Sequence, residues 1–598
     1  MTPQEWEQYR RRAADAWKAV LEPQVPLIWV SADSGALAAG AADTLREVER
    51  VVAQQGWNAQ VRKTGAFGTT WLEPVVDVHV PGRPRITYGH VTADKVEGLL
   101  RSCIGGENPR ADLAFANHGD AEYAGIPTLD STDWWRLQRR VLLARCGYVN
   151  PESLADYVGS GGYTAFTKSL LEMTPDEVIA EVKAANVRGR GGAGFPAGIK
   201  WESARSERNF PKFVISNSHE GEPNVFKDRR LMEGDPHGML EGLMIATYAV
   251  GSEAAYVYIG SEYPLALQRM QHAVDDLKAV GLLGRDILGT GMNLKVKVVP
   301  GAGAYISGEA SAAIYGLQGQ RGMPRTKPPR SAEAGLWGRP TVVNNTETLA
   351  NVPHIIANGS GWYSQVGTEL STGTKLFSLA GDVEHVCLAE LEMGCTLRDL
   401  IYTTAGGMRE GAPFRSILAG GISGGALPER TLDLTNEFGK LESEGSMMGS
   451  GGYIVYDEGT CMVDLAFYCT RFNRDESCGK CVPCRIGTAS QLAMLQRIMD
   501  GAGTERDIDR LIESSDDIIA YSLCGLGQAA PVPILSILKH YQDEVREHVL
   551  EKKCRAGVCS MKFARPTSNG VRAGDAKDDG AGFIRARTPS PLPVLTSR

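Results

Sequence analysis

The spacing of apolar side chains predicts an amphipathic helix at the start of the chain. Trp6, Tyr9, Ala13 and Trp17 recur at intervals of three and four residues, with mostly charged side chains between them. Residues at this spacing lie on one face of an α-helix. We therefore expect residues 1–24 to form an N-terminal helix. Ordinary packing against the rest of the chain is the preferred role for its apolar face, and a docking face is the alternative.

From residue 25 onward short apolar runs alternate with helical patterns. PLIWVSA, AQVRKTG, VVDVHVP and RITYGHV are typical of strands, whereas LAAGAADTLREVERVVAQQG and ADKVEGLL have helical periods. The order strand, helix, strand, then a strand hairpin and a helix predicts a thioredoxin-like domain over residues 25–103. Residues 104–165 are irregular and polar, and we expect them to form a linker that wraps the next domain.

The remaining patterns predict a multidomain α/β protein. Residues 166–355 alternate helices with short apolar strands and glycine-rich turns, which is typical of a Rossmann-like α/β domain. Residues 356–450 contain short strands and turns, which predict a small β-rich domain of the β-grasp type. Residues 451–550 have an almost entirely helical pattern, and a cysteine-bearing segment, 551–565, follows it. Residues 566–598 are rich in Pro, Gly, Ser and Asp, so a disordered tail is expected there.

Composition and charge narrow the class of protein. A chain of 598 residues is too long for one core. Its formal charge of −8 argues against a nucleic-acid binder, which needs a basic face. The N-terminus lacks a basic segment followed by an apolar core, and no run of about 18 apolar residues occurs. These features predict a cytoplasmic protein without a transmembrane segment.

Cysteine spacing carries the strongest chemical signal. A reducing compartment disfavours a disulfide framework for the 12 cysteines, so those between Cys461 and Cys524 suggest metal or cluster ligation. Cys478, Cys481 and Cys484 follow one another at two-residue gaps, and Cys524 lies in the later segment SLCGLGQAAP. Three closely spaced thiolates and one remote thiolate suit a [4Fe–4S] cluster. Zinc more often takes two CxxC pairs.

A glycine-rich loop lies near the start of the predicted Rossmann-like domain, in VRGRGGAGFPAGIKW at residues 187–201. Gly189, Gly191 and Gly194 match G-x-G-x-x-G, but a helical pattern precedes them where a dinucleotide fingerprint requires a strand. The loop amides can still cradle a phosphate, with positive charge from Arg190 and Lys200. A tight structural turn is the alternative for the glycines alone.

Polar residues also gather where the next strand ends, in FVISNSHEGEPNVFKDR. Asn217, His219, Glu220 and Glu222 fall within six residues at this point. Ligands of open α/β sheets bind at the carboxyl ends of the strands. These four side chains are therefore candidate ligand-binding residues.

Together these motifs resemble one family. ESCGKCVPCRIGT, CGLGQAAPVP and RGRGGAGFPAGIKW are similar to segments of the FMN subunit of respiratory complex I, and the same module occurs in soluble NAD-linked hydrogenases and formate dehydrogenases. The resemblance covers about residues 166–560. It implies FMN, one [4Fe–4S] cluster and either NAD(H) or NADP(H). In such proteins a hydride passes from the nicotinamide to FMN, and single electrons continue to the cluster.

The resemblance also assigns the cofactor-binding residues, with no catalytic residue beyond the flavin. His219 stands where the family usually has an aspartate, and Ala310 where it has a glutamate. The loss of two carboxylates favours a bound anion and could shift the preference from NADH toward NADPH. The cofactor-binding set is Gly189, Arg190, Gly191, Phe195, Lys200, Asn217, His219, Glu220, Glu222, Tyr305, Gly308, Glu309, Ala310, Asn344, Asn345 and Thr346.

Two further features resemble the flavin subunits of multimeric iron-only hydrogenases. Cys554 and Cys559, with His548 and Cys461, match a zinc site of those proteins, and a pair of free thiols is the alternative. The thioredoxin-like unit resembles their [2Fe–2S] domain but has lost the ligand cysteines. Ala66 and Thr70 occupy the second ligand pair, so no cluster is expected there.

The leading hypothesis is therefore a diaphorase subunit that transfers electrons between NAD(P)(H) and a partner through FMN and one [4Fe–4S] cluster. Its expected partners, in a hetero-oligomer, are a small thioredoxin-like [2Fe–2S] subunit and a catalytic redox subunit. A second hypothesis is an electron-transfer module that shuttles electrons between proteins without binding a nicotinamide. A cofactor-free scaffold is the third.

Overall fold

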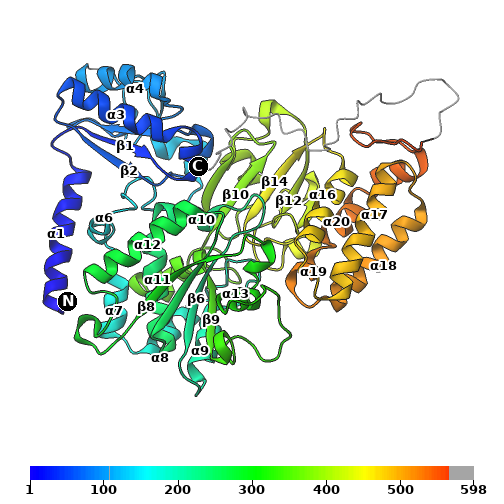
Figure 1. The fold of residues 1–598 in the computed structure, drawn as a ribbon. Helices are drawn as coiled ribbons and strands as arrows, with labels where there is room; N and C mark the ends of the chain where they lie inside the picture. The colour runs from blue at the N-terminus through cyan, green and yellow to red at the C-terminus, as the bar shows by residue number, and fades with distance from the viewer. Residues whose placement is uncertain (107, 565–598) are drawn as a thin grey trace, which may run out of the picture.

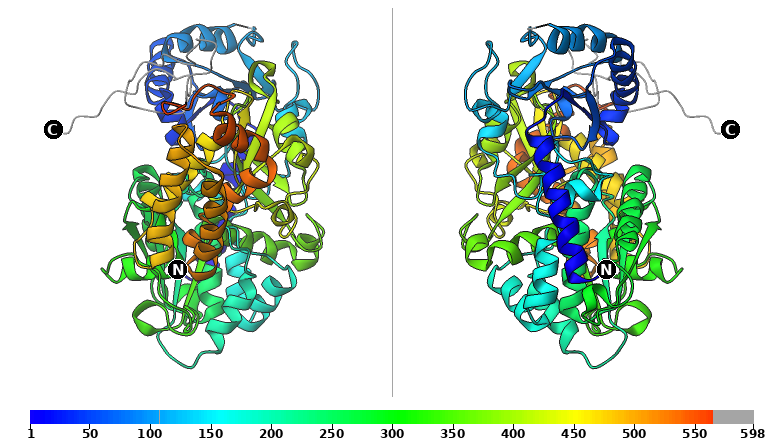
Figure 2. Two further views of the ribbon diagram at one scale, coloured as in Figure 1. Left: turned by 90° about the vertical axis from the view of Figure 1, so that its right-hand side faces the viewer. Right: turned by 90° about the vertical axis from the view of Figure 1, so that its left-hand side faces the viewer.

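The computed structural model describes residues 1–106 and 108–564 (Figure 1). The expected disordered tail, residues 566–598, lies outside this range. Helix α1 (Pro3–Leu21) begins with a capping box in which the Glu5 amide donates to the Thr2 hydroxyl over 3.2 Å. Its buried residues Trp6 and Ala13 lie on the face that the sequence pattern predicted. Figure 2 shows this helix running along one side of the molecule.

The first sheet follows α1 and has five strands in the order β2-β1-β3-β4-β5. Strand β1 pairs parallel with β2 and antiparallel with β3. Helices α3 (Ala41–Gln55) and α4 (Ala93–Leu100) cover one face through a shared apolar core. The strands are β1 (Leu27–Ser31), β2 (Gln60–Thr64), β3 (Val76–His79), β4 (Ile86–Tyr88) and β5 (Ala114–Asn117).

The stretch expected to be a linker contributes structure of its own. Strand β5 comes from it and pairs antiparallel with β4 at the edge of the first sheet. Short helices α5 (Asp133–Arg136) and α6 (Leu154–Gly159) follow, and α6 packs against α1. The sequence pattern missed β5 because a four-residue strand shows too few alternations to stand out.

The second sheet is parallel, with strands in the order β8-β7-β6-β9. Its strands are β6 (Phe213–Ser218), β7 (Ala254–Gly260), β8 (Lys295–Gly301) and β9 (Thr341–Asn345). Helices α11 (Pro236–Val250) and α14 (Thr346–Asn358) share the large core on one face, whereas α13 (Ala310–Leu317) packs with apolar residues of the other. Further helices are α7 (Thr164–Glu172), α8 (Pro175–Ala184), α9 (Ala197–Ser206), α10 (Lys227–Gly234) and α12 (Pro264–Ala279).

A mixed third sheet and a helical unit complete the described chain. The third sheet has the order β11-β10-β14-β12-β13 and its own apolar core. Its strands are β10 (Thr374–Gly381), β11 (Cys387–Glu392), β12 (Phe414–Ala419), β13 (Gly425–Leu427) and β14 (Gly452–Asp457). The helices are α16 (Met462–Asp475), α17 (Thr488–Met499), α18 (Glu505–Tyr521), α19 (Gly525–Ala529), α20 (Val532–His540) and α21 (Gln542–Arg546). Among residues 1–106 and 108–564, no helix has the length and apolarity needed to cross a membrane.

Candidate redox site

The glycine loop lies at the carboxyl edge of the second sheet. Helix α8 precedes it, as the sequence pattern indicated, and the Gly189 amide donates to the Phe195 carbonyl over 3.0 Å to close the loop. Gly194 has a φ of +62°, and an added Cβ there would lie 2.6 Å from the Phe438 ring. A Cβ on Gly191 would lie 3.0 Å from that of Asn345, the last residue of β9. The loop backbone therefore approaches the sheet edge more closely than side chains would allow.

Lys200 and Phe195 flank this loop. Lys200 is half-buried, and burial together with the charge of Lys327 lowers its pKa to about 8. Its ammonium donates to the Val343 carbonyl at 3.2 Å and lies 5.9 Å from the centre of the Phe195 ring, which is 42% exposed. A half-buried ammonium beside an exposed aromatic ring suits an anionic, planar ligand.

Asn217 and His219 supply unpartnered polar atoms at the end of β6. The Asn217 amide donates to the Gly308 carbonyl at 2.7 Å, but its Oδ1 is buried without a partner in the described chain. The His219 ring bonds the Ala302 carbonyl through Nε2 at 2.7 Å and stacks on Tyr258, while Nδ1 is likewise unpartnered. Buried polar atoms are costly when unpaired, so this edge fits a ligand with hydrogen-bonding groups such as FMN.

The two glutamates of this segment contact the protein itself. Glu220 accepts from the amides of Asp228 at 2.9 Å and Arg229 at 3.0 Å, and so caps the start of α10. Burial is the main cause that raises its pKa to about 7. Glu222 accepts from the Ser450 hydroxyl at 2.8 Å, and burial raises its pKa to about 7 as well.

Several other predicted residues also have roles within the fold. The Asn344 amide oxygen accepts from the Trp201 indole at 2.8 Å, and the Thr346 hydroxyl donates to Ser218 at 2.7 Å. Glu309 caps α13, where it accepts from the Ala312 amide at 3.0 Å, and Ala310 is partly buried among apolar residues of the sheet. These residues therefore stabilise the carboxyl edge of the second sheet through contacts within the protein.

The charged group of Arg190 is held by acceptors within the protein, including the Arg188 carbonyl of the loop at 3.3 Å. Its side chain is fully buried, and its guanidinium donates to the Thr372 carbonyl at 2.6 Å and to the Tyr363 hydroxyl at 3.2 Å. The backbone amide of Arg190 donates to Thr348 at 2.8 Å. Arg190 thereby links the glycine loop to Thr372, in the segment that leads into β10.

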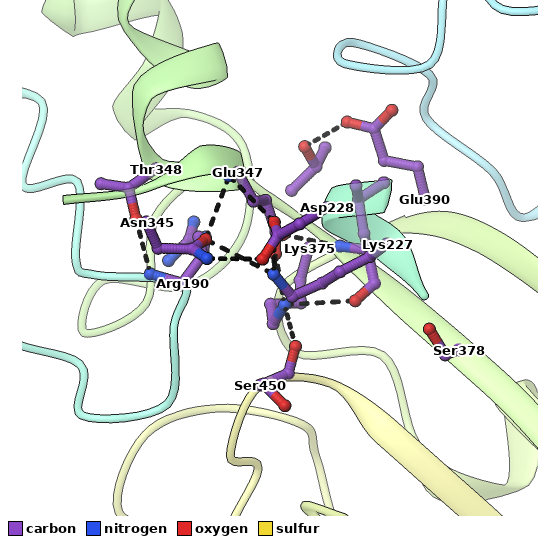
Figure 3. Close-up of polar contacts among 12 residues, drawn as sticks. Arg190, Lys227, Asp228, Asn345, Glu347, Thr348, Lys375, Ser378, Glu390 and Ser450 are labelled. Atoms are coloured by element: carbon purple, nitrogen blue, oxygen red, sulfur yellow. Dashed lines mark hydrogen bonds and ion pairs between the residues drawn. The ribbon is translucent and has the colours of Figure 1, made fainter. Parts of the chain in front are cut away.

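A buried charge network, absent from the sequence prediction, lies beneath the site (Figure 3). Glu347 accepts from Lys375 at 2.7 Å and pairs with Lys227 at 3.1 Å. Lys227 also pairs with Asp228 at 2.8 Å, and Asp228 accepts from the Asn345 amide at 2.6 Å. The segment NVFKDR contains Lys227 and Asp228. The sequence pattern did not indicate that Glu347 and Asn345, more than 100 positions away, are their partners.

The four cysteines of the expected cluster lie in one apolar cluster of side chains. Cys478, Cys481, Cys484 and Cys524 pack there with the buried residues Ile306 and Leu526, and all four thiols are free. Among the described residues, only the set around Cys461 brings three or more ligand atoms within 4.8 Å of one another. The four thiols are thus too widely spaced for a single ion, whereas a cubane with a thiolate at each corner needs such spacing.

The segment Tyr305–Gly308 joins the sheet edge to the cysteines. The Tyr305 amide donates to Glu476, directly after α16, at 2.8 Å, and its ring packs on Phe472 of that helix. Ile306 lies among the cysteines, while the Gly308 carbonyl accepts from Asn217. These four residues form one turn of 3₁₀-helix, a span of about 8 Å. The two candidate sites are therefore neighbours.

A second set of metal-binding side chains lies farther along the helical unit. Cys461 Sγ is 3.4 Å from His548 Nε2 and 3.7 Å from Cys559 Sγ, and Cys554 completes the group. The other nitrogen of His548 bonds the Glu544 carbonyl at 2.8 Å. Cys103, Cys146, Cys387, Cys395 and Cys469 are free thiols outside both sets.

Comparisons with known proteins agree with this geometry. Residues 182–354 match the Nuo51 FMN-binding domain, and residues 464–548 match the NADH-ubiquinone oxidoreductase-F iron-sulfur binding region. The NADP-reducing hydrogenase subunit HndC of Solidesulfovibrio fructosivorans is 46% identical over 71% of this chain and 86% of its own. An F subunit of NADH-quinone oxidoreductase from Rhizobium meliloti is 44% identical over 69% of this chain and 98% of its own.

A solved structure matches as well. A chain of the NAD⁺-reducing [NiFe]-hydrogenase in the H₂-reduced state aligns with a TM-score of 0.62 and 26% identity, over 91% of this chain and 87% of that one. Fold and site thus define an iron–sulfur flavoprotein subunit of the oxidoreductase class. The chain belongs to the family of the F subunits of NADH-quinone oxidoreductases, which confirms the resemblance stated from its motifs.

Proposed function

We propose that this chain is the diaphorase subunit of a hetero-oligomeric redox complex, and that it transfers electrons between NAD(P)(H) and a partner subunit through FMN and one [4Fe–4S] cluster. The turn Tyr305–Gly308 is the observation that carries the proposal. It contacts the flavin-side residue Asn217 through Gly308, and its residue Ile306 belongs to the apolar cluster that contains the four cysteines. Electrons that reach the sheet edge therefore have a short route to the cysteines.

FMN, when bound, exchanges a hydride with a nicotinamide and single electrons with an iron–sulfur cluster. Lys200 and the loop amides around Gly191 bind the anionic part of the flavin, while Asn217 and His219 offer their unpartnered atoms to its polar edge. Phe195 gives an exposed ring for a nicotinamide to pack on. Glu220, Asn344, Asn345 and Thr346 hold these groups in place through contacts within the protein.

The first sheet resembles a thioredoxin-like unit that has lost its cluster. Residues 1–106 contain a single cysteine, Cys103, and its buried thiol faces the Tyr88 hydroxyl at 3.3 Å. Thr70 offers no thiolate, and its hydroxyl instead accepts from Arg230 at 3.0 Å. We infer a docking or structural role for this unit in a cytoplasmic complex, beside a small [2Fe–2S] subunit and a catalytic redox subunit.

Anaerobic titration of the FMN-loaded protein with NADH and with NADPH tests the proposal. Bleaching of the flavin absorbance by either nucleotide is the expected result, and Cys524→Ser should retain this first step while losing transfer to the cluster. The absence of bleaching with both nucleotides would contradict it. That outcome would favour the second candidate, transfer between proteins without nicotinamide, which the replacements at His219 and Ala310 suggest.

We also propose that Cys461, His548, Cys554 and Cys559 bind a zinc ion. Zinc–sulfur bonds of about 2.3 Å and zinc–nitrogen bonds of about 2.0 Å place tetrahedral ligands roughly 3.5–3.8 Å apart. The distances among Cys461, His548 and Cys559, 3.4 to 3.7 Å, agree with this arrangement. The bond from His548 to the Glu544 carbonyl is the support that a metal-bound histidine usually receives.

Metal analysis of two variants separates this site from the cluster. Cys554→Ser should lose zinc and keep iron, whereas Cys524→Ser should lose iron and keep zinc. Cys469→Ser, which removes a buried thiol outside both sets, is the matched control and should keep both metals. Zinc contents that are equal in the wild-type protein and Cys554→Ser would refute the assignment.

A further inference from the structure

A pocket that shares no residue with the redox site lies between α1 and the first sheet. Its volume is about 290 Å³, close to the lower end of small-molecule sites. Trp17, Val20 and Leu21 of α1 form one wall, and residues of β1, of β3 and of the turn before β4 form the opposite wall. The full lining is Trp17, Val20, Leu21, Trp29, His79, Pro84, Arg85, His118 and Tyr148.

Packing on either side keeps this pocket open. Helix α1 is fixed to the large core by Trp6 and Ala13, and its backbone at Ala13 touches α6 so closely that a Cβ on Gly159 would lie 2.4 Å from the Ala13 carbonyl. The last turns of α1 then line the pocket with Trp17, Val20 and Leu21. Strand alternation explains the opposite wall, because Ile28 and Val30 face the core beneath α3 while Trp29 faces the pocket.

A buried cation stands in the wall of the pocket. Arg85 is 7% exposed, and its guanidinium carbon lies 4.2 Å from the centre of the Trp29 ring and 4.7 Å from that of Tyr148. One terminal nitrogen donates to the Asp77 carboxylate and, over 2.5 Å, to the Gly147 carbonyl. The other terminal nitrogen, Nη1, donates no hydrogen bond to any of the described residues.

Asp77, whose side chain is 1% exposed, pairs with Nη2 and compensates the charge of the guanidinium, but it makes no contact with Nη1. Burial lowers the pKa of both His79 and His118, and the charge of Arg85 lowers it further, so both rings are neutral near pH 7. The His118 ring is engaged by the Thr87 and Tyr148 hydroxyls. The pocket thus has aromatic walls and a guanidinium nitrogen, Nη1, that can donate to a ligand.

We infer that this pocket binds a small planar anion, specifically an aromatic carboxylate. An apolar cavity of 150 Å³ holds benzene, so a pocket of 290 Å³ holds about twelve non-hydrogen atoms. The ring of such a ligand packs between Trp17 and Trp29, and its carboxylate accepts from Arg85 Nη1. Binding fastens the end of α1 to the first sheet. This site is independent of the proposed nicotinamide chemistry.

Calorimetric titration of the FMN-loaded protein with benzoate, with benzamide as the uncharged probe of nearly equal shape, tests the inference. Benzoate should bind saturably and roughly tenfold more tightly than benzamide, because only the carboxylate makes a charge-assisted bond. Val20→Trp fills the pocket and should abolish binding. Ala19→Trp, which places the same ring on the exposed side of α1, should leave binding unchanged.

Arg85→Met should remove the preference for benzoate over benzamide. Should this variant fail to fold, the comparison of Val20→Trp with Ala19→Trp still decides the matter. Three results would overturn the inference: no saturable binding of benzoate or of the larger 2-naphthoate, equal affinity for benzoate and benzamide, or binding that survives Val20→Trp. None of these results depends on reduction of the flavin.

Discussion

At the scale of single residues, Lys200 holds a half-buried charge that has no carboxylate partner among the described residues within ion-pair distance. A bound anion is therefore its natural counterpart. Lys200→Met should weaken FMN binding roughly tenfold, the effect of losing one charge-assisted hydrogen bond. Fluorescence titration of the flavin-free protein with FMN measures this. Lys183→Met, on an exposed lysine paired with Glu202 at 2.7 Å, should bind FMN as the wild type does.

The carboxyl of Glu73 allows a test of how the stability of the fold depends on pH, at a residue outside the cofactor-binding set. Burial raises the pKa of this carboxyl to about 7, and the Ser31 hydroxyl and the Val75 amide only partly oppose the shift. A folded-state pKa above the unfolded value means that the folded protein holds the proton more tightly. The contribution of Glu73 to stability is therefore complete below about pH 4.5 and is lost as the pH rises to about 7.

Glu73→Gln should remove this dependence. The free energy of unfolding of the wild-type protein relative to the variant should fall by about 3 kcal/mol between these two pH values. Urea unfolding at pH 5 and pH 8 provides the measurement, and the relative form cancels the contribution of other groups. A difference that stays constant with pH would show that Glu73 is ionised normally.

At the scale of elements, the buried network ties the second sheet to the third. Lys375 on β10 donates to Glu347 on α14 at 2.7 Å and to the Ser450 carbonyl before β14 at 2.8 Å. Lys227 of α10 completes the group. Charges that lie this deep are tolerated only as partners of one another, so the network fixes how the two sheets meet.

Lys375→Met should destabilise the protein by about 3 kcal/mol, because it leaves Glu347 buried with one cation fewer. The double variant Lys375→Met/Glu347→Gln should lose less than the sum of the two single variants. Lys183→Met removes an exposed ion pair and should cost no more than about 1 kcal/mol. Additive losses in the double variant would indicate that the two side chains are not coupled.

At the scale of the whole molecule, the described chain offers one set of cluster cysteines. We therefore expect about four irons per chain, and not the six that an additional [2Fe–2S] cluster in the first sheet unit would give. Iron analysis of the anaerobically purified protein checks the number. About six irons would show that another part of the chain binds a cluster, and well under four would favour a cofactor-free scaffold.

Features that short segments encode could be predicted from the residues of those segments alone. Helix α1, the glycine loop after a helix and the ligand spacing of Cys478, Cys481 and Cys484 depend on neighbours within a few residues, and each was predicted from them. The family followed from the same motifs and was confirmed. The four-residue strand β5 was missed because its pairing with β4, and not its own pattern, makes it a strand.

Contacts between distant groups depend on the folded chain. The family resemblance grouped Cys461 with Cys559, 98 positions away, and folding brings their sulfurs to 3.7 Å. Arg190 was expected at a phosphate, but its fully buried guanidinium binds Thr372, a partner that no local pattern indicates. A buried charge is stable only beside a partner, and folding alone brings that partner from another element. The pocket at Arg85 likewise depends on folding, because it brings residues of α1 opposite residues of the first sheet.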